Sequence, residues 1–292
     1  MIVGSTRMIA ALSVLYSRSM LADADSYSPS AMKPQAVVAS WQSLGIPLHI
    51  LAPDPITPDD LCLAHAKHYV DGVLSGDIAN GFGTHDPQVA NSLLYTNSAM
   101  LAAARVALES GGFAVAPCSG FHHAGYDFGG AFCTFNGLVV AAQWLKSRGL
   151  VNRVGILDFD MHYGNGTDDI LARLSLDYVR HYTAGADWHE AWDGEDFLDA
   201  IDGIVEAMAD CDLILYQAGA DPHVDDPLGG FLTTEQLLVR DRRVFAAARA
   251  RKLPVAWNLA GGYQRDASGG IRPVLDIHDN TLRACWENGG GA

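Results

Sequence analysis

Long apolar runs are missing from this sequence. No segment approaches the roughly 20 consecutive apolar residues that a membrane-spanning helix requires, so we do not expect an integral membrane protein. The apolar residues 8–15, which follow Arg7, have the length of a signal-peptide core, but they suit a first buried strand equally well. We favour the strand, because no clear small-x-small cleavage site follows it.

Paired cysteines are also absent. The five cysteines are scattered, odd in number and include no C-x-x-C pair, which argues against a disulfide framework and against a cysteine zinc site. A reducing, cytoplasmic location is therefore expected.

Basic residues are scarce as well. The chain has 19 Lys and Arg against 34 Asp and Glu, a formal net charge of −15. Such a field repels phosphate backbones and anionic lipid surfaces, so neither nucleic acid nor a membrane is an expected partner. It would mildly attract cationic substrates such as polyamines or lysine-rich segments, although ordinary acidic enzymes show the same balance.

The chain does contain enough apolar residues for a large core, because 49% of its residues are hydrophobic and only 18% are charged. We find no linker or internal repeat and expect one domain over residues 1–292. Strand-like and helix-like runs alternate, which predicts an α/β fold of three layers (α/β/α) around a mostly parallel central sheet. The expected strands are residues 9–16, 48–51, 113–116, 153–158, 174–179, 213–217 and 255–259.

Three helices carry clear local signals. Apolar residues three to four apart mark a helix over residues 195–209. The spacing of Thr233 and Gln236 is that of a capping box and opens another helix. A third helix, over residues 135–148, should end at Gly149, which can adopt the left-handed conformation.

The chain is organised around residues 154–166, where a short apolar run ends in acids, a histidine and two glycines. Asp158, Asp160 and His162 alternate at this point, so their side chains would share one side if the extended backbone continued. Carboxylates beside an imidazole are metal-ligand chemistry. The alternative is a helix cap, a solvated acid and a satisfied core histidine.

Other expected strands end in similar residues. His122 and His123 follow the strand at 113–116, Asp221 follows the strand at 213–217, and Tyr263 follows two glycines after the strand at 255–259. Each feature alone is ambiguous. Because ligands in parallel sheets gather beyond the carboxyl ends of the strands, however, all of these residues can converge on one site.

At this point the motifs resemble those of the zinc-dependent histone deacetylase family, which includes bacterial deacetylase-like amidohydrolases and acetylpolyamine amidohydrolases. The matching segments are G-F-H-H-A-G at 120–125, A-F-C at 131–133, D-F-D-M-H-Y-G-N-G at 158–166, A-G-A-D at 218–221, D-P-L-G at 226–229 and G-G-Y at 261–263. They occur in the family's order and span residues 61–263. The resemblance implies an arginase/deacetylase-like fold and hydrolysis of an acylated amine.

The resemblance also implies a role for each motif residue. Asp160, His162 and Asp221 would bind one Zn²⁺ per chain. The base and acid would be His122 and His123. Asp158 would support His122, and Asn165 would support His123. Tyr263 would stabilise the oxyanion.

A narrow substrate channel is implied as well. Its residues would be Phe132, Leu228 and Gly130, with Trp188 at the mouth, although a packing role suits Trp188 equally. The implied substrate is an acylated lysine in a protein or peptide, or an acetylated polyamine, and an oligomer is possible. Two other functions are a silent module that binds acylated amines and a dinuclear manganese ureohydrolase, which would need more carboxylates at the metal edge.

Two features depart from the family's pattern. Relatives hold a potassium ion near the zinc with the help of a serine, and here it would lie near Asp158, Asp160 and His162. The corresponding residues 179–183 read V-R-H-Y-T, without that serine. The family's arginine beneath the active site has only a tentative counterpart in Lys33.

Overall fold

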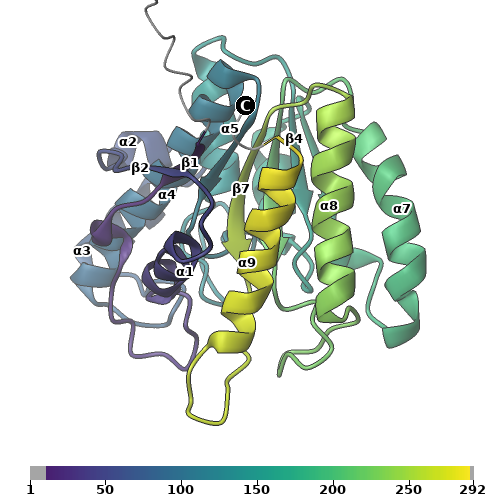
Figure 1. Ribbon diagram of the computed structural model, residues 1–292. Helices are drawn as coiled ribbons and strands as arrows, with labels where there is room; N and C mark the ends of the chain where they lie inside the picture. Colours follow the sequence, from purple (N-terminus) through teal and green to yellow (C-terminus); the bar gives the residue numbers. More distant parts are fainter. Residues whose placement is uncertain (1–10, 290–292) are drawn as a thin grey trace, which may run out of the picture.

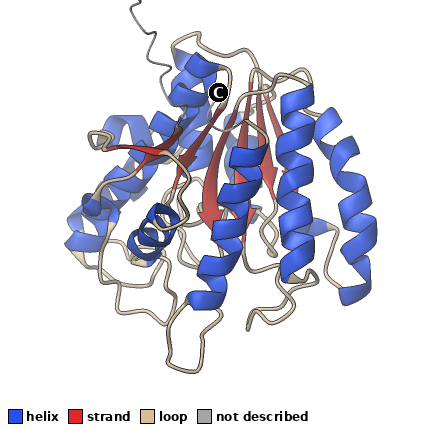
Figure 2. Ribbon diagram, in the orientation of Figure 1, coloured by secondary structure: helices blue, strands red, loops and turns tan. Residues whose placement is uncertain are grey.

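The computed structural model describes residues 11–289. Within them, seven parallel strands form one sheet in the order β2-β1-β3-β7-β6-β4-β5 (Figure 1). The strands are β1 (Leu12–Leu15), β2 (Leu48–Leu51), β3 (Phe113–Ala116), β4 (Val154–Asp158), β5 (Val179–Thr183), β6 (Leu213–Gly219) and β7 (Val255–Ala260). Because all strands run the same way, their carboxyl ends lie along one edge, where the arrowheads point in Figure 2.

Helices cover both faces of the sheet. The helices are α1 (Lys33–Gln42), α2 (Pro58–Leu61), α3 (Lys67–Ser75), α4 (Pro87–Ser110), α5 (Gly137–Ser147), α6 (Asn165–Leu174), α7 (Gly194–Glu206), α8 (Thr234–Ala250) and α9 (Arg272–Glu287), with 3₁₀ turns at Arg18–Met20, Ala184–Ala186 and Ala191–Asp193. In Figure 1, α1, α7, α8 and α9 lie in front of the sheet, and α4 and α5 lie behind it. Two apolar cores fill the spaces between the layers. The predicted three-layer α/β/α architecture is confirmed.

The central strands show why the sequence folds this way. Every residue of β3, β4, β6 and β7 is buried, as expected of parallel strands covered on both faces. The register pairs Asp158 of β4 with Gln217 of β6, and Gln217 with Asn258 of β7. Polar residues at the ends of three neighbouring strands are therefore brought side by side.

Most of the strand predictions are confirmed, and one is wrong. The first expected strand begins at residues 9 and 10, which lie outside the described residues; β1 covers its later part. Residues 174–179 were expected to form a strand, but α6 continues to Leu174 and ends at Ser175, which has a left-handed φ of 52°. The strand begins only at Val179. Because β5 lies at the edge of the sheet and exposes Arg180, it lacks the continuous apolar run used to find the others.

The three predicted helices are confirmed as α5, α7 and α8. At the start of α8 the Thr233 hydroxyl accepts a hydrogen bond from the Gln236 N–H, and the Gln236 side chain accepts one from the Thr233 N–H. Gly149, just past α5, has a φ of 66°. In residues 11–289 no helix has both the length and the apolar character to cross a membrane.

Removal of the α8 cap should destabilise the protein. Thr233→Ala leaves the Gln236 N–H in the first turn of α8 without its side-chain acceptor, which costs about 1 kcal/mol in the free energy of unfolding. Chemical denaturation measures this difference. Thr233→Ser, which keeps the hydroxyl, is the matched control and should stay close to the wild type; equal losses in both variants would contradict the capping role.

Candidate active site

The site is built by loops that follow four adjacent strands. β3, β7, β6 and β4 are neighbours in the sheet, so the segments after them meet at one edge. These segments carry the histidine pair, Tyr263, Asp221 and the Asp160–His162 pair. The fold therefore brings these residues to one edge of the sheet, as the sequence led us to expect. A cavity lies at this edge.

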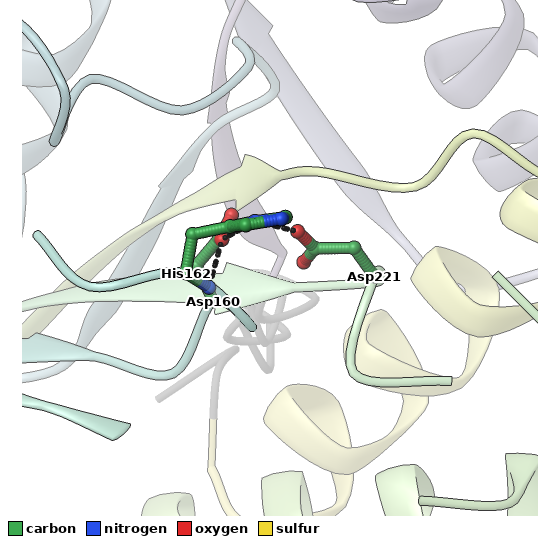
Figure 3. Close-up of side chains that lie close together, drawn as sticks. All are labelled: Asp160, His162 and Asp221. Carbon is green, nitrogen blue, oxygen red and sulfur yellow. Dashed lines mark hydrogen bonds and ion pairs between the residues drawn. The ribbon is translucent and has the colours of Figure 1, made fainter. Parts of the chain in front are cut away.

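Asp160, His162 and Asp221 form a compact cluster in which two carboxylates face one imidazole (Figure 3). Nδ1 of His162 lies 3.1 Å from Oδ1 of Asp160 and 3.0 Å from Oδ2 of Asp221. Potential ligand atoms of all three residues lie within 4.8 Å of one another. The side chains of Asp160 and Asp221 are 4% and 0% exposed, whereas His162 is 35% exposed, so the cluster opens to solvent on the imidazole side.

The charge of this cluster favours a cation. Burial and the negative charge of Asp160 raise the pKa of Asp221, because two buried carboxylates so close together oppose each other's ionisation. Hydrogen bonds to Asp160 and Asp221 raise the pKa of His162 to about 10. Two carboxylates and one imidazole, with one side open, are a donor set that fits a catalytic zinc ion.

The backbone around the cluster is tightly packed. The chain bends after Asp160, and the His162 N–H donates to Oδ1 of Asp160 at 2.9 Å. The extended backbone therefore does not continue from Asp158 to His162, although the His162 side chain still reaches the acids. A Cβ on Gly219 would lie 2.6 Å from the Cα of Asp160, and one on Gly185 would lie 2.2 Å from the carbonyl carbon of His162. Glycine at both positions allows the close approach.

Gly261 has the tightest contact with the cluster. Its φ is +47°, and an added Cβ would lie 2.1 Å from the carboxyl carbon of Asp221. The next residue, Gly262, also has a left-handed φ, of +86°. These two glycines explain the G-G-Y motif, because they let the chain pass over Asp221 and turn Tyr263 into the cavity.

His122 and His123 lie side by side, with ring centroids 4.1 Å apart. Nδ1 of His122 lies 2.6 Å from Oδ2 of Asp158, and Nδ1 of His123 lies 2.6 Å from Oδ1 of Asn165. Each ring can donate its Nδ1–H to that oxygen, which leaves Nε2 free. Both histidines line the cavity together with Asp160 and His162.

The two histidines differ in basicity. Burial alone would lower the pKa of His122, but the charges of Asp158 and Asp160 outweigh it and raise the pKa to about 9. Burial and the neighbouring His122 lower the pKa of His123, and the hydrogen bond to Asn165 only partly offsets them. The cause is that a carboxylate stabilises an imidazolium more strongly than an amide does.

Tyr263 completes the cavity. Its backbone N–H donates to Oδ2 of Asp226 at 2.8 Å, which fixes the start of this loop. Burial and the charges of Asp221 and Asp160 raise the pKa of the Tyr263 phenol well above its ordinary value. The hydroxyl therefore stays protonated at neutral pH and can act as a hydrogen-bond donor.

Phe132 forms an aromatic wall of the cavity. Phe132 and Ala131 have φ values of 68° and 45°, a strained conformation for side chains larger than glycine. Gly130 does not line the cavity but pairs with Cys133 through two backbone hydrogen bonds, which hold this turn. Leu228 lies in the lining and is 40% exposed, as expected for a rim residue.

Trp188 is not where the channel prediction placed it. Its ring packs against Phe197 with a centroid distance of 5.6 Å, and its Nε1–H donates to the Tyr182 hydroxyl. Trp188 is absent from the cavity lining, so the packing alternative is the correct one. The segment after β5 leads through two 3₁₀ turns into α7, which carries Phe197, the residue that Trp188 contacts.

Sequence reasoning missed one supporting residue, Gln217, and left another, Lys33, tentative. Gln217 is fully buried; its Nε2–H donates to Oδ1 of Asp158, and its Oε1 accepts from the Phe121 N–H. It therefore links Asp158 to the loop that carries His122. A polar residue at a buried strand position was the available signal.

Lys33 lies beneath the site and is almost fully buried, with Nζ donating to the Gly261 carbonyl. Burial lowers the pKa of Lys33 to about 8, although Asp221 and Asp160 act to raise it. Lys33 thus supports the backbone at Gly261 and adds positive charge under the two acids.

Comparison with known proteins identifies a family whose sequence model spans the residues of this site. The sequence model of the histone deacetylase domain matches residues 30–177 and 176–272. The chain is 31% identical over 180 residues to an uncharacterised protein of Picosynechococcus, covering 56% of this chain and 60% of that protein. It is 26% identical over 271 residues to histone deacetylase 2 of Arabidopsis thaliana, covering 80% of this chain and 67% of that protein.

The fold also has solved counterparts. An acetylpolyamine aminohydrolase from Burkholderia pseudomallei superposes with a TM-score of 0.72 at 17% identity, covering 94% of this chain and 98% of that one. At this identity the likeness concerns the fold. It agrees with the all-parallel sheet and its flanking helices.

Gly261→Ala should weaken metal binding. The new methyl group would displace the Asp221 carboxylate, and loss of ligand support of this kind lowers metal affinity by roughly 10- to 100-fold. Titration with Zn²⁺ followed by calorimetry measures the affinity. Gly229→Ala is the matched control, because Gly229 also has a positive φ, +95°, but an open space for a Cβ. Equal weakening in both variants would mean that backbone strain alone is responsible.

Asn165→Asp should make His123 more basic. A carboxylate at hydrogen-bond distance from Nδ1 stabilises the imidazolium, and we expect the pKa of His123 to rise by roughly one pH unit or more. NMR titration of the ring protons reports this value. Asn165→Ser, which adds no charge, should leave it near the wild-type value; an unchanged pKa in the aspartate variant would refute the electrostatic explanation.

Proposed function

This chain belongs to the histone deacetylase domain family, and on that premise we propose that it is a zinc-dependent amidohydrolase. It would remove acetyl or related acyl groups from lysine-type amines, working as a single catalytic domain. The observation that carries the proposal is the cluster of Asp160, His162 and Asp221 beside two histidines and a tyrosine in one cavity. The five unpaired cysteines suit work in a reducing compartment such as the cytoplasm.

Asp160, His162 and Asp221 would hold the zinc ion. When bound, the ion supplies Lewis-acid polarisation of an amide carbonyl and lowers the pKa of a coordinated water. The partial exposure of His162, compared with the two buried aspartates, leaves this side of the cluster accessible to a substrate.

The histidine pair would move the protons. Nε2 of each ring is left free by its Nδ1 contact, so one histidine can accept a proton from the attacking water, and a protonated histidine can donate to the leaving amine. The contrast between Asp158 and Asn165 gives the two rings different basicities, which suits a division between these tasks. The products would be a carboxylate and a free amine.

Tyr263 would stabilise the negative charge that develops on the acyl oxygen. Its phenol is protonated at neutral pH because burial and the nearby acids disfavour the phenolate. A fixed donor at the oxyanion stabilises the transition state more than the ground state.

The substrate class follows from the cavity wall. Phe132 and Leu228 offer apolar contacts to an acyl-bearing alkyl chain, as in acyl-lysine or an acetylated polyamine. The net charge of −15 favours a cationic amine of either kind. The first relatives match this chain over 60% and 67% of their own lengths, so substrates are taken from the site and not from those names.

A silent binding module is the second candidate. Against it stands the presence of every group that catalysis would need: the cation-binding cluster, both histidines and the tyrosine hydroxyl. A dinuclear manganese enzyme is less suited, because among the described residues the cluster of potential ligands at this edge holds only Asp160, His162 and Asp221.

The deciding experiment is turnover by zinc-loaded wild type and Tyr263→Phe. Acetyl-lysine peptide, acetylated polyamine and longer acyl-lysine peptides should be offered in parallel. We expect kcat to fall by about 10²- to 10³-fold in the variant, because one oxyanion donor is lost. Zinc affinity should stay unchanged, since Tyr263 is not a ligand.

Metal removal provides the second arm. Chelation should abolish turnover, and Zn²⁺ should restore it to the wild type but not to Asp221→Asn. A wild-type protein that binds acyl-lysine peptide without hydrolysing it would support the silent module, and full activity after complete removal of metal would overturn the proposal.

A further inference from the structure

We propose that Arg240 is a positioning residue that sets the spacing between Asp160 and Asp221. Its guanidinium joins the backbone just after β4 to the backbone at the end of β6, and each of these segments leads into one of the two acids. The inference rests on the metal site of the proposed function and names a residue outside that site which shapes it.

The guanidinium of Arg240 contacts two backbone carbonyl groups. Nη1 donates to the Gly219 carbonyl at 2.6 Å and to the Phe159 carbonyl at 3.3 Å. Phe159 directly precedes Asp160, and Gly219 lies two residues before Asp221. One nitrogen of Arg240 therefore contacts both of the segments that present the acids.

This contact lies where β4 ends. The ladder between β4 and β6 runs as far as the pair of Asp158 and Gln217, and the Phe159 N–H extends it by donating to the Gln217 carbonyl at 3.0 Å. The chain then bends away from the strand direction, whereas β6 continues to Gly219. Arg240 donates to both chains just past the last paired residues of this ladder.

A second set of contacts holds Arg240 in place. Its Nε donates to Oδ1 of Asp241 at 2.8 Å, and this carboxylate also accepts from the hydroxyls of Tyr216, at 2.5 Å, and Thr281, at 2.6 Å. Tyr216 belongs to β6, and Thr281 belongs to α9, which lies beside α8 in Figure 1. The sheet and a neighbouring helix thus fix the orientation of the guanidinium.

Stability alone does not account for a charge at this place. The side chains of Arg240 and Asp241 are 0% and 1% exposed, and the cost of desolvating a buried ion pair can exceed its attraction. Nη2 of Arg240 is also buried, without a hydrogen-bond partner among the described residues. Apolar side chains of similar volume often replace such a pair without loss of stability, but they cannot donate to two carbonyls.

The contact with both carbonyls bears on the distance between the acids. Asp160 and Asp221 would have to stay close together to share one ion, although their charges repel each other. A link one residue before Asp160 and two residues before Asp221 opposes their separation. Arg240 therefore holds the two carboxylates at a fixed spacing before an ion binds.

Arg240→Lys tests the proposal. Lysine keeps the positive charge but lacks the planar fork with which arginine reaches Asp241 and both carbonyls. We expect the affinity for Zn²⁺ to fall by roughly 10- to 100-fold, the range typical of residues that orient metal ligands. Competition with a chromophoric chelator measures this affinity, and the visible absorption of the Co²⁺-loaded protein reports a change in ligand geometry.

Thr281→Val is the matched control. It removes one hydrogen bond to Asp241 from the same buried network, but it leaves the contacts of Arg240 with the carbonyls. Both variants should have a lower Tm than the wild type, whereas Thr281→Val should keep the wild-type Zn²⁺ affinity and Co²⁺ spectrum. An equal loss of affinity in the two variants would overturn the proposal, because it would follow from lower stability alone.

A double variant covers the case in which Arg240→Lys does not fold. Arg240→Met combined with Asp241→Leu removes the ion pair as a whole and leaves no unpaired buried charge. This protein should fold and should bind Zn²⁺ at least as weakly as expected for Arg240→Lys. A double variant with wild-type affinity would show that Arg240 does not place the acids.

Hydrogen exchange in the metal-free protein separates this inference from the proposed function. The backbone amides of residues 159–162 and 219–221 should exchange faster in Arg240→Lys, or in the double variant, than in the wild type and Thr281→Val, because local opening becomes easier. A wild type that binds no Zn²⁺ would end the proposed function, but the exchange rates would still decide the role of Arg240. Unchanged exchange in both segments would overturn that role.

Discussion

The pairing of two buried carboxylates is the constraint on which the rest of this structure depends. Asp160 and Asp221 come from loops after different strands, and both contact Nδ1 of His162. Two such charges cannot remain ionised together away from water unless a positive charge lies between them. The pairing of the two acids therefore makes this cluster a place for positive charge.

The neighbouring groups hold this arrangement in place. Gly219 and Gly261 allow the backbone to press against Asp160 and Asp221, and Lys33 supports the Gly261 carbonyl from below. On the other side, Gln217 links Asp158 to the loop of His122. These supports come from β6, from the segment after β7 and from α1, so the geometry of the site depends on several segments that are distant in the sequence.

Much of the fold could be predicted from local patterns in the sequence. The buried strands appear as apolar runs, and the Thr233 capping box marks the start of α8, because these signals arise within a few residues. β5 was misplaced because an edge strand with an exposed Arg180 has no such run. Trp188 was ambiguous because an aromatic residue after a strand can pack or line a cavity, and only its contact with Phe197 distinguishes the two.

The sequence by itself determined which groups reach the carboxyl edge of the sheet: acids and histidine after β4, a histidine pair after β3, an aspartate after β6 and a tyrosine after β7. The order of the strands in space, and hence the meeting of these groups, was decided by the tertiary structure, since strand order depends on contacts between distant segments. The same holds for Gln217 and Lys33. Their roles arise from the atoms packed beside them, which no local pattern records.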